Sequence, residues 1–208
     1  MSEIVVPDYG CVTNTKVYGL YESFRRAKFP MSVDVNKLTE ELTKGIRALA
    51  QSPKGEGHDN WLCGVIVQFD LTFSNKAWVE MERYHFCDII SSQSTMHRMT
   101  RFSLDEAFDE HTDPRVVEIM REKIAEYNAL LADPEANHEL LEERYLEILH
   151  TNPAGFMLTA GMSTNYRQLK TIYAQRRHHR LPIWREFCAW IETLPYAELI
   201  TGEQGVKH

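Results

Sequence analysis

Apolar and polar positions alternate most regularly between residues 65 and 73. The apolar positions lie two residues apart: Val65, Val67, Phe69, Leu71 and Phe73. A period of two places every second side chain on the same face of an extended chain. The pattern predicts a half-buried β-strand, which follows a loop at 52–60 that contains two glycines and a proline.

Apolar residues three or four positions apart predict amphipathic helices elsewhere in the chain. The segments with this spacing are 35–50, 113–132, 133–150, 163–177 and 181–195. Suitable N-terminal caps begin the first four, namely Asp34, Asp113 with Pro114, Asp133 with Pro134, and Ser163 or Thr164, and Pro182 lies at the start of the fifth. The second and third segments follow each other so closely that we expect a helical hairpin with a solvated, Glu-rich face.

These elements predict an α/β (α+β) fold with an antiparallel or mixed sheet, flanking helices and a helix-rich C-terminal half. Regular strand–helix alternation is missing, which argues against a Rossmann arrangement. The 208 residues are 43% hydrophobic and contain no repeat or long linker. We therefore expect a single domain over residues 1–208.

The net charge of -7 disfavours sequence-independent binding to the phosphate backbone of nucleic acid, so nucleic acid is not an expected partner. No apolar run approaches 18 residues and the start does not resemble a signal peptide, which predicts a cytoplasmic protein without a membrane partner. The four cysteines are scattered and form no CxxC pair. We therefore expect buried thiols and no metal.

The segment 91–102, SSQSTMHRMTRF, places Gln93, His97, Arg98 and Arg101 within nine positions. Arginine and histidine donors either pair with acids or hold phosphate and similar anions. Pairing of the two arginines with the acidic run at 104–113 is an equal alternative at this point. An isolated histidine such as His97 is more often structural than catalytic.

A second polar group lies in the segment 163–180. Asn165, Leu169, Ile172 and Arg176 are spaced four, three and four residues apart, so they share one helix face that should point inward. An inward arginine needs an anionic or hydrogen-bonding partner, which favours a ligand role for Asn165 and Arg176. Arg167 lies in the first turn, where backbone N–H groups also favour anions.

Other residues of this segment have simpler interpretations. We expect Arg177 and Arg180 to be exposed. Adjacent histidines on a helix point about 100° apart, so His178 and His179 are poorly placed to share a metal ion.

The order of these motifs resembles that of the flavin-dependent thymidylate synthases. Gln93 to Arg98 fits the family's Q-x-x-R-H-R element with one change, and Asn165 to Leu169 fits its N-x-R-x-L element fully. Arg176 lies nine residues past Arg167, as the family pattern requires. His58 is a looser match to an upstream family histidine.

The resemblance implies the fold of that family and a homotetramer with sites at subunit contacts. It implies FAD bound by His58, His97, Arg98, Asn165 and Arg167. It also implies a deoxyuridine nucleotide near Gln93 and Arg176, which would be the catalytic pair, with NADPH and methylenetetrahydrofolate as co-substrates. No side-chain nucleophile is required, because the cofactor supplies the chemistry.

The chain also departs from the family pattern. Met96 replaces the first arginine of R-H-R, and the S-x-N-E-x-S-x-R element falls on 101–108 without its serines or its arginine, so that Phe108 stands at the last position. Leu149 and Cys63 stand where the family has an arginine and a glutamate. Arg101 and His150 are candidates to replace the lost substrate contacts.

Three functions are therefore compatible with the sequence. The first is a flavin-dependent methyltransferase of the thymidylate synthase type, active in nucleotide biosynthesis on dUMP or a variant of it. The second is a catalytically inactive homologue that binds a nucleotide or a protein partner. The third is an architectural protein whose basic patches brace subunit contacts.

Overall fold

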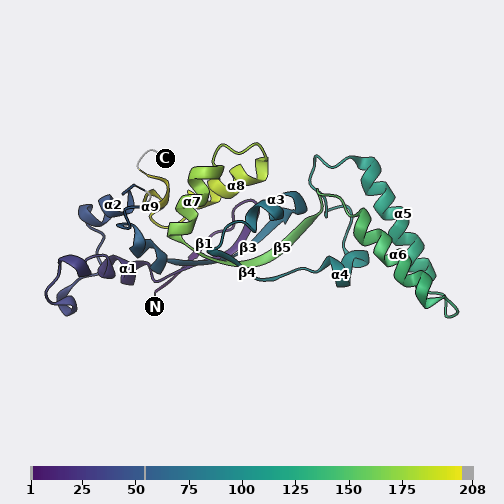
Figure 1. Ribbon diagram of the computed structural model, residues 1–208, viewed down its shortest axis with the longest axis horizontal. Helices are drawn as coiled ribbons and strands as arrows, with labels where there is room; N and C mark the ends of the chain where they lie inside the picture. Colours follow the sequence, from purple (N-terminus) through teal and green to yellow (C-terminus); the bar gives the residue numbers. More distant parts are fainter. Residues whose placement is uncertain (1, 54, 203–208) are drawn as a thin grey trace. The chain divides into compact units, whose positions relative to one another are not determined.

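The computed structural model describes residues 2–53 and 55–202, which form five strands and nine α-helices (Figure 1). The strands are β1 (Glu3–Val6), β2 (Val12–Tyr18), β3 (Ile66–Ser74), β4 (Cys87–Ser92) and β5 (Met157–Asn165). The α-helices are α1 (Leu20–Arg26), α2 (Lys44–Ala50), α3 (Asn75–Met81), α4 (Thr95–Arg98), α5 (Pro114–Leu131), α6 (His138–Thr151), α7 (Tyr166–Arg176), α8 (Pro182–Ile191) and α9 (Glu198–Thr201). Short 3₁₀ turns occupy Phe29–Met31, Val35–Lys37, Asn60–Gly64 and Met99–Arg101.

The strands form one five-stranded sheet in the order β1-β2-β3-β5-β4. β1 pairs antiparallel with β2, and β2 pairs antiparallel with β3, with a register shift between Thr13 and Lys16. The predicted strand is β3, and its buried positions alternate as the sequence pattern requires. The predicted α/β fold with flanking helices and a helix-rich C-terminal half is confirmed.

The chain divides into two compact units. The first contains the residues up to Leu71, Met81–Ser91 and the residues from Ala160 on; the second contains Thr72–Glu80 and Ser92–Thr159. The expectation of a single domain over 1–208 stays a prediction.

In the first unit, α8 covers one face of β2 and β3. Trp190 of α8 packs at a tilt against Phe69 of β3 with ring centroids 4.6 Å apart, and its Nε1 donates to the Thr15 hydroxyl of β2 at 3.1 Å. The segment 181–195 has the apolar spacing of an amphipathic helix, and the residues of its apolar stripe are all buried: Trp184, Phe187, Cys188, Ile191 and Leu194. This aromatic layer fixes the helices that follow β5.

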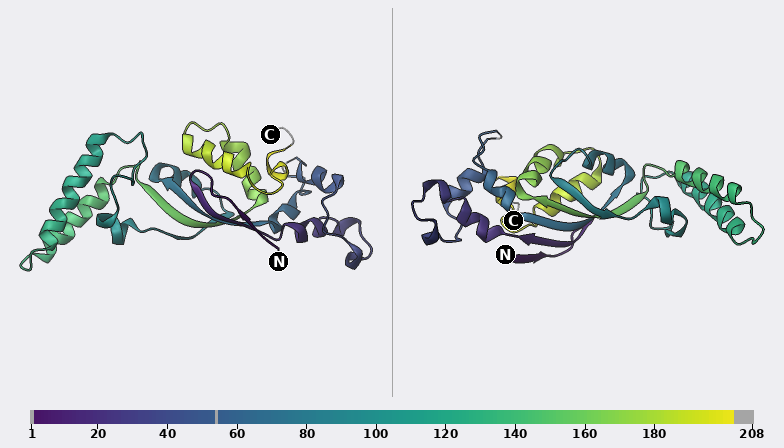
Figure 2. Two further views of the ribbon diagram at one scale, coloured as in Figure 1. Left: turned by 180° about the vertical axis from the view of Figure 1, so that it is seen from behind. Right: turned by 60° about the horizontal axis from the view of Figure 1, so that its bottom comes forward.

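In the second unit, α5 and α6 pack side by side as the expected hairpin (Figure 2). Their inner faces join a hydrophobic cluster built around the fully buried Phe156, Met99, Met120 and Ile148. Asp113 accepts a hydrogen bond from the Arg115 amide and Pro114 occupies the first turn, so the predicted start of α5 is confirmed.

Three predicted helices differ from the structure. Asp34 caps the 3₁₀ turn Val35–Lys37 as predicted, but the helix does not continue from there to residue 50. The segment 35–50 is helical only at its two ends, because Arg25 donates to the Val35 carbonyl at 2.6 Å and Lys28 to the Thr39 carbonyl at 2.8 Å. These long-range donors occupy carbonyls that a continuous helix would use itself. The helix α2 then begins after Thr43, whose hydroxyl accepts from the Ile46 amide.

The other two starts are shifted along the sequence. Asp133 accepts from the Glu135 amide in a turn, and Asn137 caps α6 instead. Ser163 and Thr164 belong to β5, where the Thr164 hydroxyl donates to the Phe86 carbonyl at 2.7 Å. Asn165 caps α7 in their place.

Within the described residues, no helix has both the length and the apolar character to cross a membrane.

Candidate functional site

A cavity of about 670 Å³ lies along α7 within the first unit. The residues that give it chemical character are Asp59, Phe86, Asn165, Arg167, Gln168 and Lys170. Its volume is in the usual range for a small-molecule site, where a few polar groups orient a ligand. It is therefore the candidate site of this unit.

Asn165 joins β5 to α7 at one end of this cavity. Its backbone is extended, with φ -138° and ψ 164°, and its side-chain oxygen accepts from the Gln168 amide at 2.9 Å. This is the standard N-cap geometry, which satisfies one of the amides that have no partner within the helix. The amide of Tyr166 is bound by the Val65 carbonyl of the neighbouring chain segment. The predicted ligand Asn165 thus lines the cavity and also starts the helix.

Arg167, in the first turn of α7, is anchored by an acid from a distant part of the chain. Its Nε donates to Oδ1 of Asp59 at 2.9 Å, and Lys170 donates to Oδ2 of the same carboxylate at 2.9 Å. Asp59 is only 5% exposed. Burial alone raises the pKa of Asp59, but Lys170 and Arg167 outweigh it and hold that pKa below its ordinary value. The carboxylate therefore remains ionised between its two cations.

The sequence pointed to His58, which is exposed, and missed its neighbour Asp59. Asp59 stands out only through its ion pair with Arg167, which lies 108 residues further along the chain. No local pattern around 58–60 could reveal this pairing.

Arg176, at the other end of α7, is half-buried and faces aromatic rings. Its Nε donates to the Tyr84 hydroxyl at 2.7 Å, and its guanidinium carbon lies 4.7 Å from the Trp184 ring centroid. The Tyr84 hydroxyl in turn donates to Gln175, which lines the cavity. The shared inward face is confirmed, since Leu169 and Ile172 are fully buried. On this face, the contacts of Arg176 include a hydroxyl and two aromatic rings.

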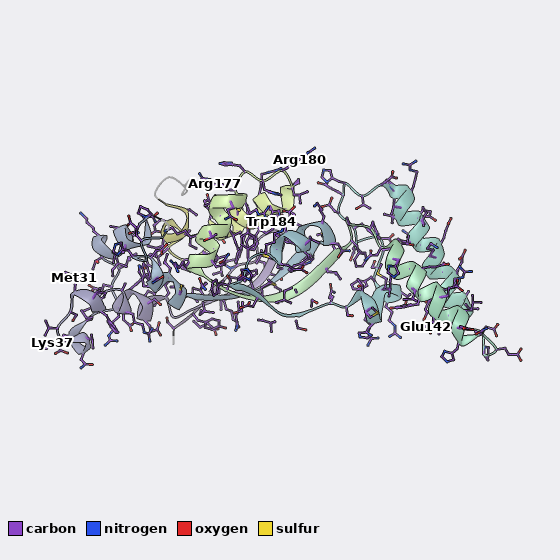
Figure 3. All side chains as sticks on the ribbon, in the orientation of Figure 1. Met31, Lys37, Glu142, Arg177, Arg180 and Trp184 are labelled. Atoms are coloured by element: carbon purple, nitrogen blue, oxygen red, sulfur yellow. The ribbon has the colours of Figure 1, made fainter. Side chains whose placement is uncertain are left out.

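Arg177 and Arg180 are both exposed, as expected, and they mark the outer side of the α7–α8 connection in Figure 3. Among the described residues, no group of three or more His, Cys, Asp or Glu side chains is placed to hold a metal ion.

The segment 93–101 belongs to the second unit and begins where β4 ends. Gln93 pairs with β5 through both backbone and side chain, because its amide donates to the Thr159 carbonyl at 3.0 Å and its side-chain oxygen accepts from the Thr159 amide at 2.9 Å. Met99 is fully buried in the hydrophobic cluster and anchors the segment. Gln93 thus has a structural role besides the predicted ligand role.

His97, Arg98 and Arg101 are exposed around this anchor. Nearby acids have other partners: Asp105 pairs with Arg121 at 2.9 Å, and Asp113 pairs with Arg115. Among the described residues of the second unit, no ion pair joins Arg98 or Arg101 to the acidic run at 104–113. The described ion pairs therefore do not include the alternative pairing of these arginines with that run.

The predicted site residues thus fall into two groups. Within the first unit, the structure brings Asn165 and Arg167 together at the cavity. The cations at 97, 98 and 101 are gathered within the second unit.

Two positions at which the family pattern of the sequence resemblance has arginine are apolar, and both side chains contact one cluster. Phe108 packs edge-on against Phe156 with centroids 5.4 Å apart, and Leu149 packs against the same cluster. Hydrocarbon thus occupies both positions, and neither can bind an anion.

Comparison with known proteins supports the fold. No protein-family model matches the chain, and no curated protein matches it. A solved structure of the flavin-dependent thymidylate synthase ThyX from Helicobacter pylori, complexed with FAD and dUMP, is similar over 100% of both chains with a TM-score of 0.65 and 13% identity. A second structure of ThyX from the same organism with FAD and dUMP gives a TM-score of 0.63 and 15% identity, again over 100% of both chains. At this identity the likeness establishes a shared fold.

Proposed function

We propose that this protein is a flavin-dependent enzyme of the thymidylate synthase kind, which uses FAD and a folate one-carbon donor to modify a pyrimidine deoxynucleotide. One observation carries the proposal above all: in a chain with this fold, Asn165 and Arg167 meet at a cavity of about 670 Å³. These are the two residues that the N-x-R-x-L resemblance assigns to FAD.

The cavity has the chemistry that FAD requires. A flavin dinucleotide combines flat aromatic rings with an anionic pyrophosphate. Phe86 is 67% exposed and supplies an aromatic surface, while Arg167 supplies a fixed cation. When bound, the reduced flavin would supply the electrons of the reaction. The protein residues would hold and orient the reactants.

The second cationic group would complete the site. His97, Arg98 and Arg101 are exposed, and the described ion pairs of their unit leave the two arginines available to an anionic ligand. In a homo-oligomer such as a tetramer, this group can come from a neighbouring copy. We propose that NADPH and methylenetetrahydrofolate are the co-substrates of the reaction. We also propose that the protein acts in the cytoplasm.

A specific observation also favours the second candidate, a homologue that binds a nucleotide without turnover. Phe108 and Leu149 place hydrocarbon where the resemblance expects two arginines. Each charge-assisted hydrogen bond that is lost without replacement is worth about 1.5–3 kcal/mol. Without compensation from Arg101 or His150, binding of dUMP would be weakened by orders of magnitude.

Release of tritium from C5-labelled dUMP separates the two candidates. The mixture contains the full-length protein, FAD, NADPH and methylenetetrahydrofolate, each omitted in turn. The enzyme proposal predicts release that requires every component, is lost in Arg176→Gln and is retained in Arg177→Gln, an exposed arginine next to it. FAD binding without tritium release would favour the non-catalytic homologue.

A further inference from the structure

Asp59 and Lys170 have no assigned role, although both line the candidate cavity. The carboxylate is almost fully buried and each of its oxygens accepts one hydrogen bond from a cation, Arg167 on one side and Lys170 on the other. A buried carboxylate with two cationic partners is a costly feature to keep unless it fixes something. The hydrogen bonds of Lys170 and Arg167 show which group the carboxylate fixes.

Lys170 is fully used by protein acceptors. Its ammonium nitrogen donates to the Ala50 carbonyl at 2.6 Å, to the Ser52 carbonyl at 3.3 Å and to Asp59 at 2.9 Å. An ammonium group has three donors, so these three bonds leave none for a ligand. Lys170 therefore ties the end of α2 and Asp59 to α7 and holds the carboxylate in place.

Arg167 is only partly used. A guanidinium has five N–H donors, and Asp59 accepts the one on Nε. The Cys63 side chain also interacts with this guanidinium, whose side chain is 38% exposed at the cavity. The donors on the two terminal nitrogens therefore include some that are available to an anionic ligand, and the bond to Asp59 fixes their direction.

We propose that Asp59 is a positioning residue that aims Arg167 at the anionic group of the ligand, with Lys170 as its support. This positioning role depends on the proposed function in one respect only, namely that the ligand is FAD. The contribution to affinity comes from a guanidinium that is already ordered, because an unanchored arginine loses its rotamer freedom on binding.

A charge-matched double variant tests this role. Two cations and one anion give the cluster one net positive charge, and Asp59→Asn with Lys170→Gln leaves the same net charge on Arg167 alone. The positioning role predicts that this double variant binds FAD about tenfold more weakly than the wild type. Asp59→Asn alone makes the net charge of the cluster one unit more positive. If the cluster only sets the local charge, the single variant should bind FAD more tightly than the wild type, and the double variant should bind it with unchanged affinity. That second result overturns the proposal.

The double substitution could also weaken FAD binding by loosening the cavity in general. Repeating Asp59→Asn with Lys170→Gln in an Arg167→Gln background distinguishes this effect from the positioning of Arg167. If Asp59 acts through Arg167, the two substitutions cause no further loss of FAD affinity there. An equal loss in both backgrounds would show a merely structural role and would overturn the proposal.

Inorganic pyrophosphate separates failure of this inference from failure of the proposed function. If the wild-type chain binds no FAD, the proposed function is wrong, and the same variants are titrated with pyrophosphate by calorimetry. Binding by the wild type that weakens about tenfold in the double variant supports the positioning role. Absence of pyrophosphate binding, or equal affinity in both proteins, overturns it.

Discussion

The four cysteines lie in very different surroundings. Burial raises the pKa of Cys87 and of Cys188 to about 12, with nearby Asp88 and Glu192 acting in the same direction, and burial raises that of Cys11 further still. Cys63 is exposed and lines the cavity beside Arg167. Since the thiolate is the reactive form, buried thiols with a raised pKa react slowly, and an accessible thiol reacts first.

We expect a disulfide reagent at pH 8 to modify one thiol per native chain, at Cys63. The Cys63→Ser variant should show no fast reaction, whereas denaturant should expose all four thiols in the wild type. Absorbance of the released thiol reports the count. Rapid reaction of two or more thiols in the native protein would contradict the described burial.

The Asp59 cluster predicts a specific loss of stability in acid. The pKa of Asp59 is lowered in the folded chain, so its ionised form contributes stability that is fully present above the ordinary value near 3.8. That contribution is lost as the pH falls through the folded pKa. We expect Asp59→Asn to be less stable than the wild type at pH 7, and the difference to shrink below about pH 4.

Chemical denaturation at several pH values measures this difference. Lys37→Gln is a suitable control, because Lys37 pairs with Asp34 in an exposed position. A gap between wild type and Asp59→Asn that stays constant down to pH 3 would contradict the assignment.

The candidate site could be predicted only in part from the sequence. Asn165 and Arg167 could be predicted, because they lie two positions apart in a local motif. The fold places this motif at a cavity. Asp59 could not be predicted from the sequence, since its two partners lie 108 and 111 residues away and no pattern in the loop at 52–60 indicates them. The structural role of Gln93 was missed for a related reason, because its side chain accepts a hydrogen bond from Thr159, which lies 66 residues further along the chain.

At the scale of the element, α7 depends on its cap for both structure and site. Asn165 satisfies the Gln168 amide and places Arg167 in the first turn. Loss of an N-cap side chain costs about 0.5–2 kcal/mol.

We expect Asn165→Ala to lower the free energy of unfolding by about 1 kcal/mol and Asn165→Asp to restore most of it, because aspartate is an equally good cap. Ser163→Ala is the matched control, since Ser163 lies in β5 and does not cap the helix. Urea denaturation monitored by circular dichroism gives the values. If Ser163→Ala costs as much as Asn165→Ala, the cap has been assigned to the wrong residue.

Element prediction succeeded where a single local pattern decided the outcome. β3, α5 and α8 have strong periodicity, and α5 and α8 also have proline in the first turn. Prediction failed for 35–50, where Arg25 and Lys28 from an earlier segment take two backbone carbonyls. Side-chain donors of this kind compete with the helix and leave no periodic signal.

At the scale of the whole molecule, the net charge of -7 is unevenly distributed along the chain. The hairpin α5–α6 is rich in glutamate, and Glu142 lies on its surface (Figure 3). The cavity, by contrast, has two cations for one carboxylate. An acidic protein thus keeps a locally positive site, which is suited to an anionic cofactor.

The central claim is that this cavity binds FAD, and the visible absorbance of FAD titrated with the purified full-length chain tests it most directly. We expect a saturable change in the flavin bands with one FAD per chain, and a weaker change with Arg167→Gln than with Arg177→Gln. A flavin spectrum identical to that of free FAD at every protein concentration would contradict it.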